Sequence, residues 1–234
     1  MAGSFYSCAS KDETHPEKAT GEWFSNVKVK NASEFSDIVL VKLMGFDRNL
    51  DRYVELARGD WKDGSFTIVP PETLASNYLH PLISSYSYGF LTVIIDPPST
   101  MSISNPNINV GNVQIWGFDK DDNLVAMFHQ FKVDGDSNTE VVYTYVDSDV
   151  NISGYLERMT IVTEYDEGKN MDVLCEWKVN TTYFIQWKKG WNVWYHSSSN
   201  SLTERVMTEH WSSTPINGIE WNGSEEDLWK YQSQ

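Results

Sequence analysis

The sequence predicts an all-β protein, built as an antiparallel β-sandwich that could hold two β subdomains, with one short helix near residues 71–83. Segments rich in Val, Ile, Thr and aromatic residues recur about every 8–12 residues. Gly, Asn, Asp, Ser and Pro separate them, and no helical periodicity lies between them, which excludes an alternating α/β fold. With 234 residues, 40% of them hydrophobic and 14% aromatic, the chain can bury a large core.

The predicted strands run from residue 22 to residue 221. Ile38–Val41 is apolar at every position and is expected to be a central strand, whereas Val141, Tyr143 and Tyr145 alternate with Thr144 and predict one wetter face. The full set of predicted strands is 22–30, 36–46, 51–58, 64–69, 88–96, 99–104, 112–119, 124–132, 139–147, 150–156, 158–165, 171–178, 181–187, 191–196, 203–209 and 217–221.

Three reversals of the chain have a recognisable turn chemistry. Asp63-Gly64 and Asn217-Gly218 supply the positive φ angles that tight turns require. Trp187–Trp191 is interpreted as a hairpin with a three-residue loop, in which Gly190 takes the left-handed position.

One segment favours a helix. Pro71–Ile83 begins with prolines, which suit a first helical turn, and its apolar residues are spaced for one face. Pro81 lies inside the segment, so the helix is expected to be only a turn or two long.

The chain divides into a polar N-terminal tether, residues 1–19, and a β domain, residues 20–234. Proline, serine and asparagine gather between residues 97 and 111, which makes this segment the best candidate for an internal boundary. It could separate two β subdomains, or simply carry the chain from one sheet to the other.

The first residues resemble the end of a bacterial lipoprotein signal peptide. Phe5-Tyr6-Ser7-Cys8 is a short apolar-to-small run ending in Cys, and the charged stretch Ala9–Lys18 follows at once. The sequence therefore predicts that Cys8 carries the lipid; the alternative is an ordinary terminus with a chance cysteine. Cys175 lies in an apolar run and is expected to be a small core residue.

The charge balance excludes one class of partner. The chain has 18 Lys+Arg against 33 Asp+Glu and a formal charge of −15. Nucleic-acid binding needs a clustered basic patch, which the sequence lacks, so we expect no nucleic-acid partner. No apolar stretch approaches the roughly 18 residues of a membrane-spanning helix, so membrane contact is expected only through the anchor at Cys8.

Two acidic loops resemble the start of a calcium-binding loop. They are Asp119-x-Asp121-x-Asn123 and Asp134-x-Asp136-x-Asn138. Neither has the glycine and the bidentate glutamate that an EF-hand needs at its later positions. Both are interpreted as hairpin turns in which Asp and Asn cap their own backbone, and no cofactor is expected.

An aromatic cluster gives the sharpest candidate binding surface. Strand alternation between residues 191 and 196 places Trp194 with Asn192 and His196 on one face, and Trp191 with Tyr195 on the other. An indole beside polar groups suits a sugar ring, so Trp194, Asn192 and His196 are the predicted ligand-binding residues. The alternative is that these tryptophans are core residues.

The sequence shows no recognisable catalytic motif. The sequence contains no nucleophile elbow, no zinc-protease motif and no phosphate-binding glycine loop, so no catalytic residue is predicted. The many carboxylates could still include a general acid and base at glycosidase separation, which keeps a glycan-processing hydrolase as the alternative to a binding protein.

Several segments together resemble surface lipoproteins of the Bacteroides type. They are Val54–Pro70 with its Lys-Asp-Gly-x-Phe-Thr-Ile run, Tyr143–Gly154, Trp187–Tyr195 and Pro215–Trp221. The resemblance touches most of the chain from about residue 21 and consists of strand and turn motifs. It implies an all-β, lipid-tethered protein on the outer membrane, exposed at the cell surface, and it supplies no catalytic residues.

These observations lead to one expectation of function. We expect a cell-envelope lipoprotein that acts without catalysis, either by capturing a glycan or protein ligand or by taking part in a surface assembly. Assembly by strand addition would require an exposed edge strand.

Overall fold

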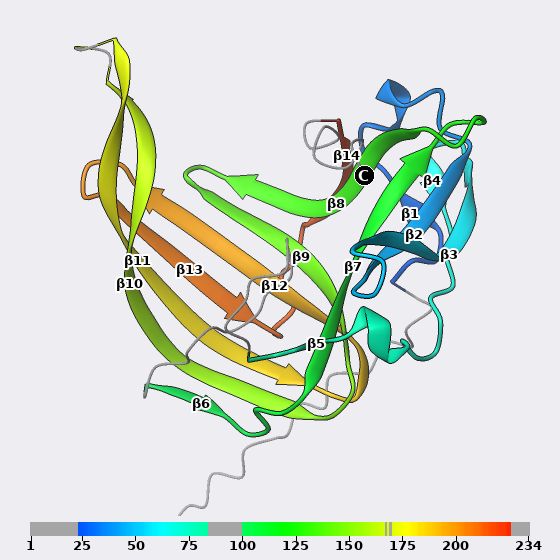
Figure 1. Cartoon of the computed structure of the whole chain (residues 1–234). Coiled ribbons are helices and arrows are strands. Elements are labelled where there is room, and N and C mark those ends of the chain that lie inside the picture. The colour runs from blue at the N-terminus through cyan, green and yellow to red at the C-terminus, as the bar shows by residue number, and fades with distance from the viewer. Residues whose placement is uncertain (1–22, 84–99, 167, 169, 226–234) are drawn as a thin grey trace, which may run out of the picture.

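The computed structural model describes residues 23–83, 100–166, 168 and 170–225 (Figure 1). Within them the chain is almost entirely strand, which confirms the all-β prediction. The strands are β1 (Val27–Lys28), β2 (Leu40–Asp47), β3 (Arg52–Lys62), β4 (Ser65–Phe66), β5 (His80–Pro81), β6 (Met101–Ile103), β7 (Asn109–Phe118), β8 (Leu124–Asp134), β9 (Ser137–Val146), β10 (Val150–Asp166), β11 (Met171–Trp187), β12 (Gly190–Ser201), β13 (Val206–Ser212) and β14 (Glu220–Ser224).

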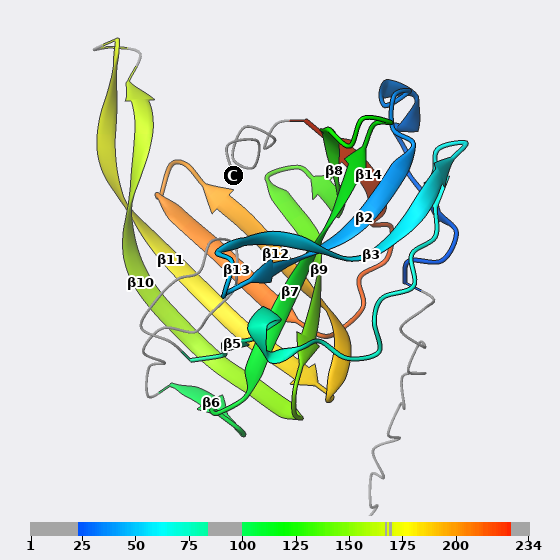
Figure 2. The same cartoon turned by 45° about the vertical axis from the view of Figure 1, so that its right-hand side comes forward.

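The strands form one strongly curved sheet (Figure 2) in the order β1-β4-β3-β2-β7-β8-β9-β12-β13-β11-β10-β6. β14 pairs with β8, and β5 pairs with β7. The pairing of named strands is antiparallel as expected, except that β13 runs parallel to β11. The sheet is therefore mixed.

Two strands are much longer than predicted. The segments 150–156 and 158–165 form the single strand β10, and 171–178 with 181–187 form β11. The polar residues between the predicted segments continue the ladder instead of turning, since Glu157 pairs with Asn180. Cross-strand pairing along 17 residues outweighs the local preference of these residues for a turn.

The turns at Asp63-Gly64 and Gly218 have the predicted left-handed φ angles, +50° and +74° in the first and +77° in the second. Gly190 also has a positive φ, but the hairpin predicted at Trp187–Trp191 is wrong. β11 and β12 are not neighbours, because β13 is inserted between them.

The short helix predicted near residues 71–83 is one turn of 3-10 helix, Ser76–Tyr78. A second 3-10 turn covers Ala32–Glu34. Pro81 belongs to β5, which pairs with the start of β7 and ends the helical region.

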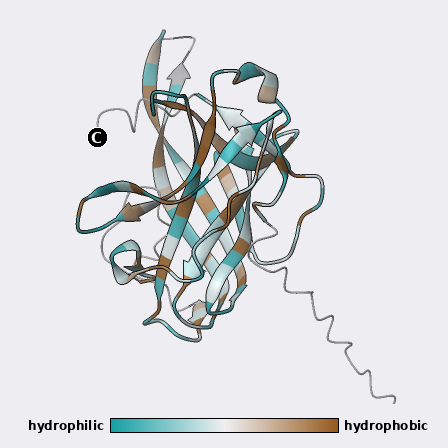
Figure 3. Cartoon of the chain, turned by 90° about the vertical axis from the view of Figure 1, so that its right-hand side faces the viewer, coloured by the Kyte–Doolittle hydropathy of each residue, from teal (hydrophilic) through white to brown (hydrophobic). Residues whose placement is uncertain are grey.

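Both faces of the middle strands are covered, as in a sandwich. Along β9 and β12 one set of side chains, including Tyr143 and Trp191, packs into a large core with β2, β7 and β14, and the other set, including Trp194, packs into a second core with Ile185 and Leu82. Figure 3 shows hydrophobic and hydrophilic residues interleaved along the crossing strands.

Several predictions concern residues outside the described ranges. Residues 1–19 with Cys8, and the predicted strand 88–96, belong to them. The candidate boundary at 97–111 is described from residue 100 onward, where β6 and β7 join the same sheet. Cys175 is buried, as expected. Across the described ranges, no helix is both long and apolar enough to cross a bilayer.

Candidate functional site

The candidate site is a cavity at the point where β7, β8 and β9 separate. β7 pairs with β9 through Val110–Asn112 and then pairs with β8 from Ile115 onward. β8 in turn reaches β9 only from Gln130. The residues between these pairings surround a gap of about 410 Å³, which is within the usual size of a small-ligand pocket.

Polar side chains from β7, β8, β9 and β12 line this cavity, together with aromatic side chains that include Trp194 on β12 and Trp211 on β13. The cross-strand register shows why they meet. Glu140 on β9 lies opposite His196 on β12, which lies opposite Trp211 on β13. Directly opposed residues share a face of the sheet, which we call the cavity face. Other residues that line the cavity include Asn112, Gln114, His129, Tyr53 and Trp194.

Histidines and carboxylates alternate across the cavity face. His129 Nδ1 lies 3.8 Å from Glu140 Oε1, and His196 Nε2 lies 3.8 Å from Glu209 Oε1. Arg158 continues the row, with its guanidinium 3.9 Å from Glu209. These separations exceed the length of a hydrogen bond.

Glu209 is the buried anchor of this row. Its side chain is about one-tenth exposed and accepts a 2.8 Å hydrogen bond from the Thr181 hydroxyl. His196 stabilises the charged carboxylate, with help from Thr181 and Arg158, and holds the pKa of Glu209 below its usual value despite burial. Glu209 is therefore a fixed negative charge beside the cavity.

The aromatic wall beside the cavity is a run of packed rings. Trp194 stacks on Trp211 with ring centres 5.0 Å apart, and Trp211 contacts Tyr183 at 5.2 Å and His196 at 5.2 Å. Trp211 is half-buried, whereas Trp194 is only 2% exposed. Trp211 therefore carries the accessible indole of this wall.

Several buried side-chain nitrogen atoms also lie beside the cavity. In the part of the chain that the structure describes, the Nε1 atoms of Trp194 and Trp211 and the Nε2 atom of His196 make no hydrogen bond. A buried donor without an acceptor lowers the stability of the folded protein by about 1–3 kcal/mol, so such groups call for an explanation.

The three predicted ligand-binding residues share the cavity face, but they occupy different environments. His196 is partly exposed and lines the cavity. Trp194 also lines it, yet it belongs to the core. Asn192 is buried, and its amide makes 2.7–2.9 Å hydrogen bonds with Lys188 and Gly190 that hold the loop before β12. The solvent-facing Trp194 that would favour sugar binding at this residue is not found.

Sequence reasoning missed the other members of the site. Glu209 and Trp211 lie on β13, which forms a hairpin with β12, and His129 and Glu140 lie on the hairpin of β8 and β9. The two hairpins meet only through the pairing of β9 with β12, which joins segments far apart in the chain. Period-two alternation could have assigned each residue to a face of its own strand, but not to a common cavity.

The two acidic loops are turns. Asp119 accepts backbone N–H groups from Asp121 and Asn123 at 2.9 and 2.8 Å and the Asn123 amide at 2.9 Å, and these bonds lower the pKa of Asp119. The loop through Asp134 and Asn138 reverses at Gly135, which has a φ of +62°. Within the described residues, no cluster of three or more His, Cys, Asp or Glu side chains could hold a metal ion.

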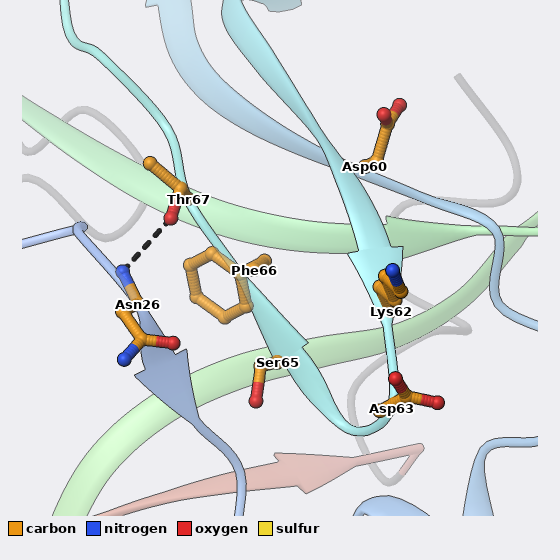
Figure 4. Close-up of a pocket in the computed structure, with 7 residues that line it drawn as sticks. All are labelled: Asn26, Asp60, Lys62, Asp63, Ser65, Phe66 and Thr67. Atoms are coloured by element: carbon orange, nitrogen blue, oxygen red, sulfur yellow. Dashed lines mark hydrogen bonds between the residues drawn. The ribbon is translucent and has the colours of Figure 1, made fainter.

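A second depression lies at the β3–β4 hairpin (Figure 4). Asp60, Lys62, Asp63 and Thr67 line it and are exposed, and Thr67 accepts a 2.8 Å hydrogen bond from the backbone N–H of Asn26. These are the ordinary solvated positions of a hairpin edge. The depression lacks the converging polar and aromatic groups of the cavity between β7, β8 and β9.

Comparison with known proteins gives no further assignment: no protein-family model, no curated protein and no solved structure matches this chain.

Proposed function

We propose that the protein is a cell-envelope lipoprotein that binds a glycan, without catalysis, in the cavity between β7, β8 and β9. The observation that carries the proposal is the accessible indole of Trp211 beside a row of histidines and carboxylates. A pyranose ring offers an apolar face for the indole and hydroxyl groups for the polar row.

The covered nitrogen atoms support the same ligand class. A hydroxyl oxygen entering the cavity could accept a hydrogen bond from Trp211 or His196 after a small rotation of either ring. Because the Trp211 N–H has no acceptor in the described residues, the ligand would recover part of the cost of burying it.

The carboxyl groups favour binding over hydrolysis. A glycosidase needs a protonated general acid, and burial is the usual means of raising a carboxyl pKa. Among the described residues, every carboxyl pKa with a resolved shift is lowered, including that of Glu209.

Calorimetric titration against a panel of neutral and acidic oligosaccharides tests the proposal. We expect Trp211→Ala to lower the affinity for the tightest-binding oligosaccharide about tenfold or more, because a central tryptophan usually contributes much of the binding energy. Glu140→Gln is expected to lower this affinity less, because the Glu140 side chain is half-exposed. His210→Ala is the matched control, because His210 is the exposed neighbour of Trp211 and points to the other face of β13.

Two results would contradict glycan binding in this cavity. One is a panel in which no oligosaccharide binds the wild type. The other is a ligand whose affinity falls equally in the His210 and Trp211 variants.

The lipid anchor is tested separately on the full precursor. We expect wild-type protein to partition into the detergent phase and Cys8→Ser to move it to the aqueous phase, because the acyl chains supply the membrane affinity. Cys175→Ser is the control, since Cys175 is buried. A wild type that stays in the aqueous phase would rule out lipidation at Cys8.

A further inference from the structure

The hairpin formed by β10 and β11 extends beyond the rest of the sheet (Figure 1). β13 covers the inner side of β11 only along Lys178–Phe184. On the other side of β10, the strand paired with it in the described part of the chain is β6, which covers Ile152–Gly154. Among the described residues, β10 has no strand partner on this side beyond Tyr155.

The free backbone groups of this edge belong to alternate residues. The Asn151 carbonyl accepts the Ser104 N–H across the β6 side, and the Tyr155 carbonyl accepts the Thr100 hydroxyl on the same side. In an antiparallel strand, the N–H and C=O of every second residue point the same way. Glu157, Met159, Ile161 and Thr163 therefore direct their backbone groups outward.

The edge also carries exposed apolar side chains. Met159 is 61% exposed, Ile161 is 65% exposed, and Leu174, whose register partner is Thr163, is 75% exposed. The three residues lie on the face opposite the cavity face. Apolar side chains on a free edge mark an association surface, because soluble proteins usually protect such edges with charge or proline.

The sequence of this edge is complementary to itself. When two copies of β10 run antiparallel about a twofold axis at Ile161, Met159 lies opposite Thr163 of the second copy. Arg158 then lies opposite Glu164, and the symmetry repeats that pair on the other side of the axis. Arg158 is 55% exposed and its guanidinium lies 3.9 Å from Glu209, beyond hydrogen-bond length, so it can turn toward a second chain.

We infer that the protein forms a twofold dimer in which the β10 edges of two copies pair antiparallel around Ile161. The odd-numbered residues that direct N–H and C=O outward are paired with one another in this register, so their hydrogen bonds are satisfied. The exposed Met159, Ile161 and Leu174 of both copies then come together on one face. The inference does not require a ligand in the cavity, although Arg158 also lies beside Glu209.

Sedimentation velocity over a concentration series, up to about 100 µM, tests the dimer, because a complex of micromolar Kd is largely formed there. Ile161→Pro removes one outward N–H without removing a hydrogen bond to β11, since proline is tolerated where the N–H faces solvent. We expect a wild-type dimer and an Ile161→Pro monomer with an unchanged circular-dichroism spectrum. Phe184→Ser is the matched control: Phe184 is 51% exposed on the same face but lies outside the paired segment, so that variant is expected to stay dimeric.

A charge reversal provides a second test that spares the backbone. Arg158→Glu places two glutamates opposite each other at both ends of the interface, and we expect the dimer Kd to rise about tenfold. A wild type that is monomeric throughout the series overturns the inference. So does a dimer that survives both the proline and the charge reversal, because association would then use another surface.

Discussion

Trp194→Ala is expected to lower the free energy of unfolding by about 3–5 kcal/mol, the usual cost of truncating a large buried aromatic side chain. Trp194 is 2% exposed and packs against Trp211 and Trp187, with ring centres 5.0 and 6.3 Å away. Its removal leaves a cavity in the second core, which includes Ile185 and Leu82. Urea unfolding at neutral pH measures the change.

Trp211→Ala provides the comparison for this result. Trp211 is half-buried, so its truncation is expected to cost less stability than that of Trp194 while affecting ligand binding more. The reverse outcome, a stable Trp194 variant that has lost ligand affinity, would show that Trp194 is the binding surface and not a core residue.

Acidification from pH 7 to pH 5 is expected to lower the free energy of unfolding by about 2 kcal/mol through one residue, His80. His80 is fully buried, and desolvation together with the nearby Arg48 charge lowers its pKa from 6.5 to about 4. The unfolded chain therefore takes up a proton at His80 between pH 6.5 and 4, whereas the folded protein does not. Stability falls as the pH decreases through this range.

The variant His80→Gln isolates this effect because glutamine does not titrate. Whatever its stability at pH 7, we expect its free energy of unfolding to fall by about 2 kcal/mol less than that of the wild type between pH 7 and pH 5. Urea titrations at both pH values measure the difference. Equal losses in the two proteins would show that His80 is not the group responsible. The carboxylates with lowered pKa values contribute at lower pH, near and below their unfolded values of about 4.

Local patterns in the chain were enough to predict much of the fold. The all-β class, the tight turn at Asp63-Gly64 and the buried Cys175 all follow from residue type and period-two alternation. These features depend on neighbouring residues, so a single sequence contains the information for them. The central strand expected at Ile38–Val41 begins only at Leu40, and Val39 is 48% exposed.

Strand partners could not be predicted in the same way. The turn chemistry at Gly190 is real, but β13 separates β11 from β12, and nothing in the residues around Gly190 specifies that insertion. The joining of the predicted segments into β10 and β11 has the same origin. The two strands are extended by pairing with each other along their whole length, and no residue within either predicted segment specifies that pairing.

The sequence by itself determined that Trp194 and His196 share one face of a strand, because alternation along a strand is a local property. Only the tertiary structure decided what that face does. Packing against Trp187 and Trp211 places Trp194 in the core, while strand register brings Trp211, Glu140 and His129 to the cavity beside His196. Burial and convergence depend on contacts between residues distant in the chain, so they emerge only when the strands have paired.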